Sequence, residues 1–373
     1  MHGNILSFLF LSFAVAVISI SVSAAGGVVG AVYTMTNAPA GNEVLVFDRL
    51  ADGSVRFSGA YDTGGLGSGD GLGNQGGVVL SRNKRWLLAV NAGSNELSVF
   101  EVRREGIVLT DVAGSGGVRP VSVAIQGDLV YVAHAGGSVG STDSVSGFRL
   151  DNKGRLLSLA GSSSPLSAPA TGPAQVGFSP DGRFLLVTEK ATSRIDVFPV
   201  DTSGYLGTPV VNSSTGQTPF AFDFGPRDQL FVSEVFGGAN DAGAVSSYSL
   251  AGDGQLFVID GSVANTETAP CWLVVTEGSR YAFTTNTPDD SLSAYAIDFD
   301  GKLELVDADG RTGEPGPGTR PLDMDLSDDG RFLYTLNIGE GSISTFRVLP
   351  DGALEHLFAE GGVPSGVNGL AAR

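Results

Sequence analysis

The side chains with most scope for acid–base chemistry in this sequence stand at the ends of short apolar runs. Glu189 follows the apolar residues 184–188, Glu234 ends a similar run one repeat later, and His134 ends an earlier one. Two neighbouring carboxylates raise one another's pKa, which suits a general base, and a histidine can carry a proton near neutral pH. Arg194, in the loop after Glu189, could stabilise a developing anion. We therefore predict Glu234, Glu189, His134 and Arg194 as catalytic residues.

These four belong to a wider set of polar side chains in equivalent positions. If the runs are equivalent strands of a repeating β-structure, their ends surround one mouth of a central channel, where ligand pockets often form. The ring comprises Asn37, Asn91, His134, Glu189, Glu234, Asn286 and Asn337, joined by Arg119, Gln175, Lys190, Arg194 and Arg320 from adjoining segments. From this set we predict ligand-binding residues at Asn91, Gln175, Asn286, Arg320 and Asn337. The alternative is that these residues, the asparagines above all, cap strand ends and hydrogen-bond exposed backbone.

The elements that position this ring are short strands, and residues 173–206 show their pattern. Residues 174–178 alternate as a short inner strand, residues 179–183 form a Ser-Pro-Asp-Gly-Arg turn, and residues 184–188 are continuously apolar, as in a strand buried on both faces. A third strand is predicted over 195–200, a turn ends at Gly204, and an outer strand starts at Tyr205. Together they make one four-stranded antiparallel blade.

The same pattern recurs along the whole chain and predicts an all-β, seven-bladed β-propeller. The turn between third and fourth strands occurs seven times, at 51–53, 103–106, 151–154, 201–204, 251–254, 298–301 and 350–352, whereas the turn between first and second strands occurs six times. The chain therefore starts inside a blade, at the second strand (32–35), and residues 368–372 supply the missing inner strand. This pairing closes the ring and removes two free edges. No amphipathic helix is expected, and the longest gap between strands is 63–77.

The first residues are typical of a targeting segment. Residues 5–20 are almost wholly apolar and are followed by the small residues 21–25, so we predict a signal peptide over 1–24, cleaved after Ala24, with the propeller over 25–373. The alternative is an uncleaved anchor, because about 18 apolar residues can just span a bilayer. The prediction is a secreted protein with no membrane association after cleavage.

Composition narrows the partners further. The net charge of −18 disfavours binding to nucleic acid or to anionic membranes. Three histidines and one cysteine cannot assemble a transition-metal cluster at ordinary spacing, so we expect no metal and no other cofactor. Cys271 begins an inner strand and is predicted to be a buried packing residue. Asn212, in the sequon Asn212-Ser213-Ser214, is the predicted glycosylation site, and a closed propeller is expected to be a monomer.

Several stretches resemble the seven-bladed lactonase family, which includes 6-phosphogluconolactonase and the fungal 3-carboxy-cis,cis-muconate lactonizing enzyme. The resemblance covers essentially the whole mature chain. Its most specific stretches are Gly172–Arg183, Thr218–Phe220 and Val232–Glu234, and the segments Val187–Thr192, Ser233–Gly238 and Ala269–Trp272 are similar to those of a secreted subgroup. The resemblance implies a propeller fold and chemistry on lactones.

The same resemblance implies a catalytic set, of which this chain keeps one member. The family places a histidine after the inner-strand proline of one blade, an arginine in the equivalent place on the next, and a glutamate at the end of that blade's second strand. Here these positions hold Ala174, Phe220 and Glu234. Phenylalanine cannot stabilise a carboxylate or an oxyanion as arginine does.

Two functions therefore stay open. One is an exported enzyme that opens, forms or isomerises a small acid or sugar lactone without a metal. The other is a non-catalytic propeller that binds a glycan, a peptide or a small ligand at the same mouth.

Overall fold

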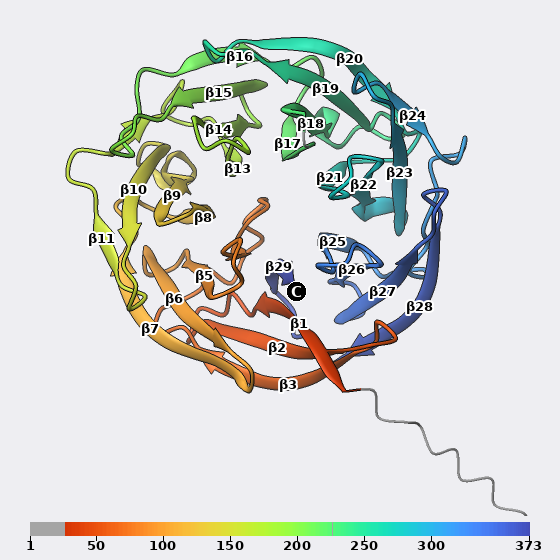
Figure 1. Ribbon diagram of the computed structural model, residues 1–373, viewed down its shortest axis with the longest axis horizontal. Coiled ribbons are helices and arrows are strands. Elements are labelled where there is room, and N and C mark those ends of the chain that lie inside the picture. Colours follow the sequence, from red (N-terminus) through yellow and green to blue (C-terminus); the bar gives the residue numbers. More distant parts are fainter. Residues whose placement is uncertain (1–26, 226) are drawn as a thin grey trace, which may run out of the picture.

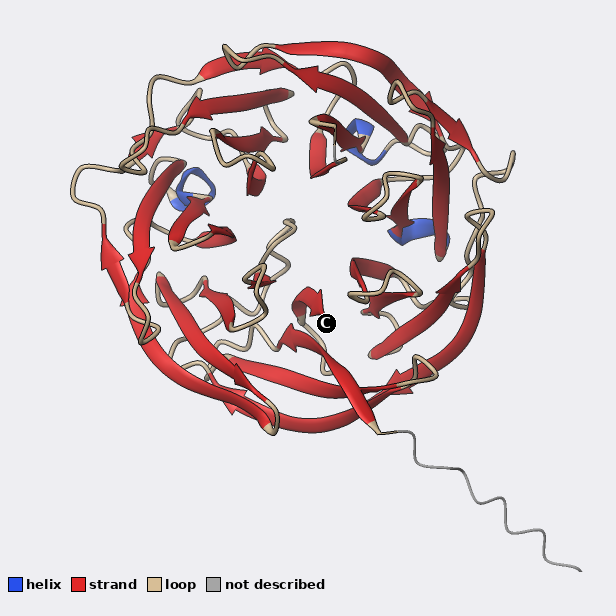
Figure 2. Ribbon diagram, viewed as in Figure 1, coloured by secondary structure: helices blue, strands red, loops and turns tan. Residues whose placement is uncertain are grey.

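The structure is a computed structural model that describes residues 27–225 and 227–373; the predicted signal peptide lies outside these residues. Seven antiparallel sheets stand in a ring around a central channel (Figure 1). Besides strands, the described residues contain only three short 3-10 turns: η1 (Gly136–Val139), η2 (Phe236–Gly238) and η3 (Thr287–Asp289) (Figure 2). The predicted all-β, seven-bladed propeller is confirmed.

In each blade the strands follow one another from the channel to the rim. Blade 1 contains β29 (Asn368–Ala372), β1 (Val28–Met35), β2 (Glu43–Leu50) and β3 (Val55–Asp62). Blade 2 contains β4 (Val78–Leu80), β5 (Trp86–Asn91), β6 (Glu96–Arg103) and β7 (Gly106–Gly114). Blade 3 contains β8 (Pro120–Gln126), β9 (Leu129–His134), β10 (Ser144–Leu150) and β11 (Leu156–Ser158), with β12 (Ser164–Pro165) also paired to β10.

The remaining four blades repeat this plan. Blade 4 contains β13 (Pro173–Phe178), β14 (Phe184–Glu189), β15 (Arg194–Pro199) and β16 (Val210–Ser213). Blade 5 contains β17 (Pro219–Phe224), β18 (Gln229–Glu234), β19 (Ala244–Leu250) and β20 (Leu256–Ala264). Blade 6 contains β21 (Pro270–Val275), β22 (Tyr281–Asn286), β23 (Ser291–Ile297) and β24 (Leu303–Leu305). Blade 7 contains β25 (Pro321–Leu326), β26 (Phe332–Asn337), β27 (Ser342–Val348) and β28 (Leu354–Gly361).

The ring closes through blade 1, as predicted. Strand β29 pairs antiparallel with β1, with Thr34 opposite Leu370 and Tyr33 opposite Ala371. The chain end is also held by side chains, since Arg49 Nε donates to the carbonyl of Arg373 at 2.8 Å. Because β29 covers the inner edge of β1, β1 becomes an interior strand of a four-stranded sheet, like the second strand of every other blade.

The outer strand of blade 4 departs from the expectation. It was predicted to start at Tyr205, but β16 begins at Val210, and Leu206 forms only an isolated bridge with Val200. Pro209 precedes the strand and has no N–H to donate to a ladder, which delays regular pairing.

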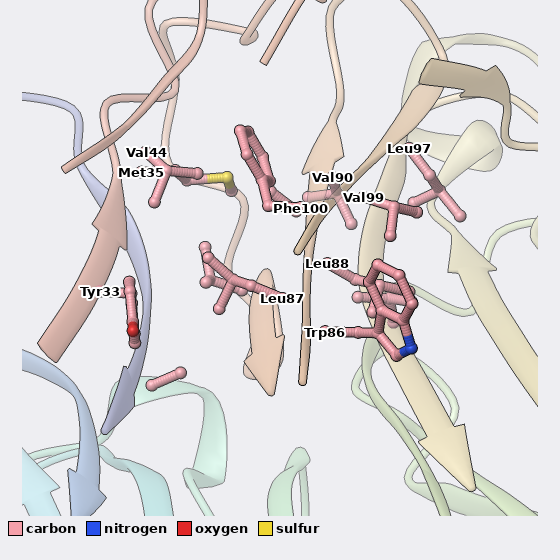
Figure 3. Close-up of a cluster of buried hydrophobic side chains, with 14 of the residues drawn as sticks. Tyr33, Met35, Val44, Trp86, Leu87, Leu88, Val90, Leu97, Val99 and Phe100 are labelled. Atoms are coloured by element: carbon pink, nitrogen blue, oxygen red, sulfur yellow. The ribbon is translucent and has the colours of Figure 1, made fainter. Parts of the chain in front are cut away.

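The core lies between neighbouring blades. Continuous apolar second strands, such as β5 with Leu87, Leu88 and Val90 fully buried, pack against the faces of the next sheets (Figure 3). Figure 3 shows Tyr33 and Met35 of blade 1 facing the blade 2 side chains across this layer. Each fully buried side chain of this size stabilises the fold by about 1.5–3 kcal/mol, so blade stacking holds the ring together without a disulfide.

The turn between third and fourth strands has the same backbone in every blade. Its glycine adopts a positive φ, between 78° and 120°, at Gly53, Gly106, Gly154, Gly204, Gly254, Gly301 and Gly352. At Gly53 a Cβ atom would lie 2.4 Å from the Phe332 ring of the neighbouring blade. Glycine is therefore needed there both for its backbone freedom and for the close contact between blades.

Candidate functional site

One mouth of the channel is covered by the glycine-rich segment 63–77, the gap between β3 and β4. In Figure 1 this orange segment reaches from the rim to the middle of the ring. The carbonyl of Asn74 accepts a hydrogen bond from Trp272 Nε1 at 2.8 Å, and the Gln75 amide donates to the carbonyl of Ala174 at 3.0 Å. The segment thus joins blade 2 to blades 4 and 6 across the channel. We call 63–77 the plug segment.

The channel walls carry amide and carboxyl side chains that link neighbouring inner strands. Gln175 Nε2 donates to the carbonyl of Phe222 at 2.9 Å, while the Phe222 amide donates to Gln175 Oε1 at 2.7 Å. Gln75 makes the same pair of contacts with Leu273, at 2.9 and 3.1 Å. Inner strands of different blades do not pair with each other, so these side chains satisfy their open edges.

Further along the channel, three aspartates accept hydrogen bonds from backbone amides: Asp223, Asp323 and Asp325. Asp223 accepts from the amide of Val275 at 2.8 Å, and Asp325 accepts from that of Ala372 at 2.8 Å. Burial raises the pKa of both carboxyls to about 6, and it raises the pKa of Asp323 as well. They line a cavity of about 300 Å³ that includes Gln75 and Gln175.

The sequence reasoning missed these aspartates, although Asp323 and Asp325 alternate with apolar residues in a strand that borders the channel. Beyond them, a second cavity of about 450 Å³ opens at the opposite mouth and includes Lys84, Glu277 and Asp328. Lys84 Nζ lies 2.8 Å from Asp328 Oδ1, so the cation at this mouth has an acidic partner.

The seven predicted ring residues lie beneath the links between blades, and each is at most 1% exposed. The asparagines bond to serines of the third strand: Asn91 Nδ2 donates to Ser98 Oγ at 2.8 Å, and Asn337 Nδ2 donates to Ser344 Oγ at 2.8 Å. Asn286 donates to Ser293 Oγ at 2.9 Å in the same way. These contacts bind each asparagine to the third strand of its own blade through a serine hydroxyl, and not through exposed backbone.

Glu234 is the most enclosed of the predicted carboxylates. Ser246 Oγ and Ser262 Oγ each donate to it at 2.6 Å, and the Gly216 amide donates at 2.8 Å. A Cβ on Gly216 would lie 2.2 Å from Glu234 Oε2, so the backbone of the link is pressed against the carboxylate. This geometry holds residues 214–218, the link between blades 4 and 5, in place. It leaves no surface of the carboxylate exposed to a ligand.

His134 is equally enclosed. Its Nε2 lies 3.0 Å from the carbonyl of Ser115, and its Nδ1 lies 3.3 Å from that of Ser144. Burial lowers the pKa of His134 to about 4, so the ring is neutral at pH 7 and can donate to only one of these two carbonyls. In this position His134 connects the link between blades 2 and 3, which contains Ser115, to strand β10 of blade 3.

Glu189 differs because its contacts lead to the surface. The Ser167 amide donates to Glu189 Oε1 at 2.9 Å, and the hydroxyls of Ser167 and Thr192 donate to Oε2. Arg194 is exposed, and its Nη1 donates to Ser167 Oγ at 3.3 Å. The structure thus brings two predicted residues, Glu189 and Arg194, to one partly exposed serine that the sequence reasoning did not single out.

A second carboxyl group lies against Glu189. Asp196, on β15, is fully buried, and its two oxygens have no hydrogen-bond donor among the described residues. Burial and the charge of Glu189 raise the pKa of Asp196 to about 8, well above the ordinary value of an aspartate. The sequence shows a lone aspartate in an apolar strand, which is the signal that could have found it.

The positive charge at the covered mouth comes from Lys190. Its Nζ lies 5.2 Å from the centre of the Phe220 ring and donates to the carbonyls of Gly73 and Pro173. Phe220 in turn packs edge-on against Trp272, with ring centres 5.2 Å apart. Lys190 takes part in none of the salt bridges among the described residues. Burial lowers the pKa of the Lys190 ammonium to about 8.

Three further residues named by the sequence analysis are Arg320, Asn212 and Cys271. Arg320 is exposed and adopts a positive φ of 52°, with its amide donating to Asp290 Oδ1 at 2.7 Å. Asn212 Nδ2 donates to the carbonyl of Gly254 at 3.1 Å, and its Oδ1 accepts from the Leu256 amide at 2.9 Å, which bridges blades 4 and 5. Burial raises the pKa of the Cys271 thiol to about 12.

Over the described residues, no group of three His, Cys, Asp or Glu side chains gathers closely enough to hold a metal ion. In the same part of the chain, no helix has the length and apolar character needed to cross a membrane.

Comparison with known proteins defines the class. The profile of the seven-bladed β-propeller lactonases matches residues 141–235 and 228–366. The chain therefore belongs to the seven-bladed β-propeller lactonase family. Among its relatives, the 6-phosphogluconolactonase of Pectobacterium carotovorum is 24% identical over 266 residues, which cover 70% of this chain and 76% of that protein. The 6-phosphogluconolactonase of Erwinia tasmaniensis is 24% identical over 280 residues, covering 72% and 79%.

Solved structures share the fold over most of the chain. A putative 6-phosphogluconolactonase from Bacteroides uniformis has a TM-score of 0.71 at 17% identity, covering 92% of this chain and 99% of that one. The periplasmic gluconolactonase of Pseudomonas aeruginosa has a TM-score of 0.67 at 19% identity, covering 91% and 98%. At these identities the likeness shows the fold alone.

Proposed function

We propose that this propeller opens, or in reverse closes, the ring of a small organic-acid or sugar-acid lactone without a metal ion, at the channel mouth beside the plug segment. The observation that carries the proposal is the place of Lys190. Its ammonium lies 5.2 Å from the ring of Phe220, the residue at the position where the family resemblance implies an arginine. The positive charge lost from position 220 is thus supplied from blade 4.

Lys190 is suited to bind an anionic group or to polarise a lactone carbonyl. An ammonium has three N–H donors, and two of them serve the carbonyls of Gly73 and Pro173. The third is available to a ligand. Because the group is largely buried and has no carboxylate partner among the described residues, its field is less screened than that of a surface lysine.

A lactone panel with two lysine variants tests this proposal. The mature chain should hydrolyse at least one aldonolactone or muconolactone, and Lys190→Met should lower kcat/KM by about a hundredfold, as loss of an oxyanion donor does. Lys84→Met is the matched control, because Lys84 stands at the opposite mouth beside Asp328. Equal loss of activity in both variants, or full activity in Lys190→Met, would refute the role of Lys190.

Ligand binding without turnover is the second candidate, and the residues Ala174 and Phe220 favour it. Both are buried, and neither can donate or accept a proton. Phe220 and Trp272 would then form the apolar wall of a binding site. Calorimetric binding of a lactone or a sugar acid with no product in the panel assay would support this candidate, and its loss in Lys190→Met would place the ligand at the same mouth.

We further propose that the chain is exported, with cleavage after Ala24, and acts as a monomer that is glycosylated at Asn212. The apolar segment 5–20 and the small residues after it support export. N-terminal sequencing of the protein recovered from the medium should begin at Ala25, and light scattering should give the mass of one chain.

A further inference from the structure

At one position of the third strand five blades hold serine, blade 1 holds Val44 and blade 4 holds an aspartate. The position is paired with the second-strand residue that precedes the ring residue of the same blade by two. The serines at this position are Ser98 in blade 2, Ser146 in blade 3, Ser246 in blade 5, Ser293 in blade 6 and Ser344 in blade 7. In blade 4 it holds Asp196. The comparison with blade 5 is direct, because Glu189 and Glu234 are equivalent and Ser246 donates to Glu234 at 2.6 Å.

Asp196 therefore stabilises the folded protein less than a serine at the same position would. It replaces a hydrogen-bond donor by a second carboxyl group, in a place where the side chain is fully buried and both oxygens lack a donor. Two carboxyl groups so deeply buried repel one another when both are charged, and burial together with the charge of Glu189 raises the pKa of Asp196 to about 8. Costly ionisable pairs of this kind are concentrated at functional sites.

The pair is connected to solvent by one hydroxyl. Ser167, in the link between β12 and β13, is partly exposed, and its Oγ donates to Glu189 Oε2 at 2.5 Å. The exposed guanidinium of Arg194 donates to the same Oγ from 3.3 Å. A hydroxyl with a carboxylate on one side and a guanidinium on the other has the two partners that acyl transfer needs, a proton acceptor and a cation near the developing oxyanion.

We propose that Ser167 is the nucleophile of an acyl-transfer site for esters, with Glu189 as its base, Asp196 as the group that tunes this base, and Arg194 as the oxyanion partner. This activity goes beyond the proposed channel chemistry, since it uses other residues and a covalent route.

The proposed reaction passes through an acyl group on Ser167. Ser167 Oγ forms a bond to the ester carbonyl carbon while its proton passes to Glu189, and the carbonyl oxygen becomes an oxyanion beside Arg194. The bond to the leaving oxygen then breaks, and that oxygen takes the proton from Glu189. Water next attacks the acyl group, its proton passes through Glu189 to Ser167, and the acid is released.

The pair gives this site a distinctive pH dependence. While Asp196 is protonated it adds no charge beside Glu189. Once Asp196 loses its proton, its negative charge makes Glu189 a stronger acceptor for the serine proton. The pKa of about 8 for Asp196 places this change just above neutral pH. The rate of attack by Ser167 should therefore rise as the pH passes through about 8.

The test is labelling of the folded protein with diisopropyl fluorophosphate, read by mass spectrometry of the peptide that contains Ser167. One adduct is expected on Ser167, formed as fluoride leaves, with a rate that rises through about pH 8. Ser167→Ala should give no adduct. Asp196→Ser, which introduces the residue of five other blades, should fold and should label at least about tenfold more slowly at pH 8.5, with no rise near pH 8.

Two controls separate this site from the rest of the molecule. Ser246→Ala, which removes the equivalent serine of blade 5, should label on Ser167 as the unaltered protein does. Lys190→Met should do the same, so that failure of the lactone assay and failure of this proposal remain distinct. Labelling of Asp196→Ser at the rate of the unaltered protein, or absence of any adduct on Ser167 at pH 9, would overturn the proposal.

Discussion

Replacement of Asp196 by serine should stabilise the protein, and the gain should grow with pH. In the unfolded chain the carboxyl has its ordinary pKa of 3.8, and in the folded chain the value is about 8, because of burial first and the charge of Glu189 second. Between these values the folded protein binds a proton that the unfolded chain does not. The stability that the folded protein gains from binding this proton is therefore fully present below about pH 4, and it is lost as the pH rises through about 8.

The size of the effect follows from the same two values. They lie about four pH units apart, and each unit corresponds to about 1.4 kcal/mol, so the loss in the free energy of unfolding is on the order of 5 kcal/mol by pH 8.5. Asp196→Ser removes this term and adds a donor to Glu189, as Ser246 provides for Glu234 at 2.6 Å. The gain over the unaltered protein should be small at pH 4.5 and several kcal/mol at pH 8.5.

Guanidinium unfolding at these two pH values, followed by the fluorescence of Trp86 and Trp272, measures the difference. Both indole side chains are buried, so their emission reports on the loss of the core. Asp253→Ser, in an exposed turn, is the control and should shift the unfolding midpoint by a similar small amount at both pH values. If Asp196→Ser gave the same gain at pH 4.5 and 8.5, the pKa of Asp196 would not be raised in the folded protein and the reasoning would fail.

Three further changes probe the frame and its modification. Gly53→Ala should destabilise the protein by about 2 kcal/mol or more, since alanine is strained at a φ of 92° and its Cβ would meet the Phe332 ring, and the fall in melting temperature measures it. Cys271 should resist iodoacetamide in the folded protein and react after unfolding, because burial raises the pKa of its thiol to about 12; fast alkylation of the native chain would contradict this. Asn212→Ala should cost about 1–2 kcal/mol through loss of the bridge to Gly254 and Leu256, whereas Asn212→Asp should retain the contact with the Leu256 amide and cost less; equal stabilities, measured on protein from a host that adds no N-glycans, would contradict the bridge.

The course of the chain could be predicted closely because its causes are local. Alternation of side chains, continuous apolar second strands and glycine turns repeat in every blade, and each depends only on neighbouring residues. Even the closure by residues 368–372 followed from the pattern, since one first-strand turn was missing from the repeat. The outer strand of blade 4 was placed too early because its start depends on where Pro209 allows pairing with β15.

The site could be predicted only in part. The ring residues were correctly assigned to equivalent strand ends, but the sequence could not show which way each side chain points or which link covers it. Successive residues of a strand face opposite sides of the sheet, and the loop that meets each face comes from another blade. Hence Glu234 and His134 proved to be enclosed by links, while Glu189 reaches the surface through Ser167.

By itself, the sequence determined the seven blades, the closure through the last strand and the family to which the chain belongs, because these depend on periodicity and on short motifs. Only the tertiary structure decided that Asp196 meets Glu189, that Lys190 lies over Phe220, and that the plug segment covers one mouth of the channel. Each of these contacts joins different strands or blades, and their energies come from burial and charge, which arise only once the ring has closed.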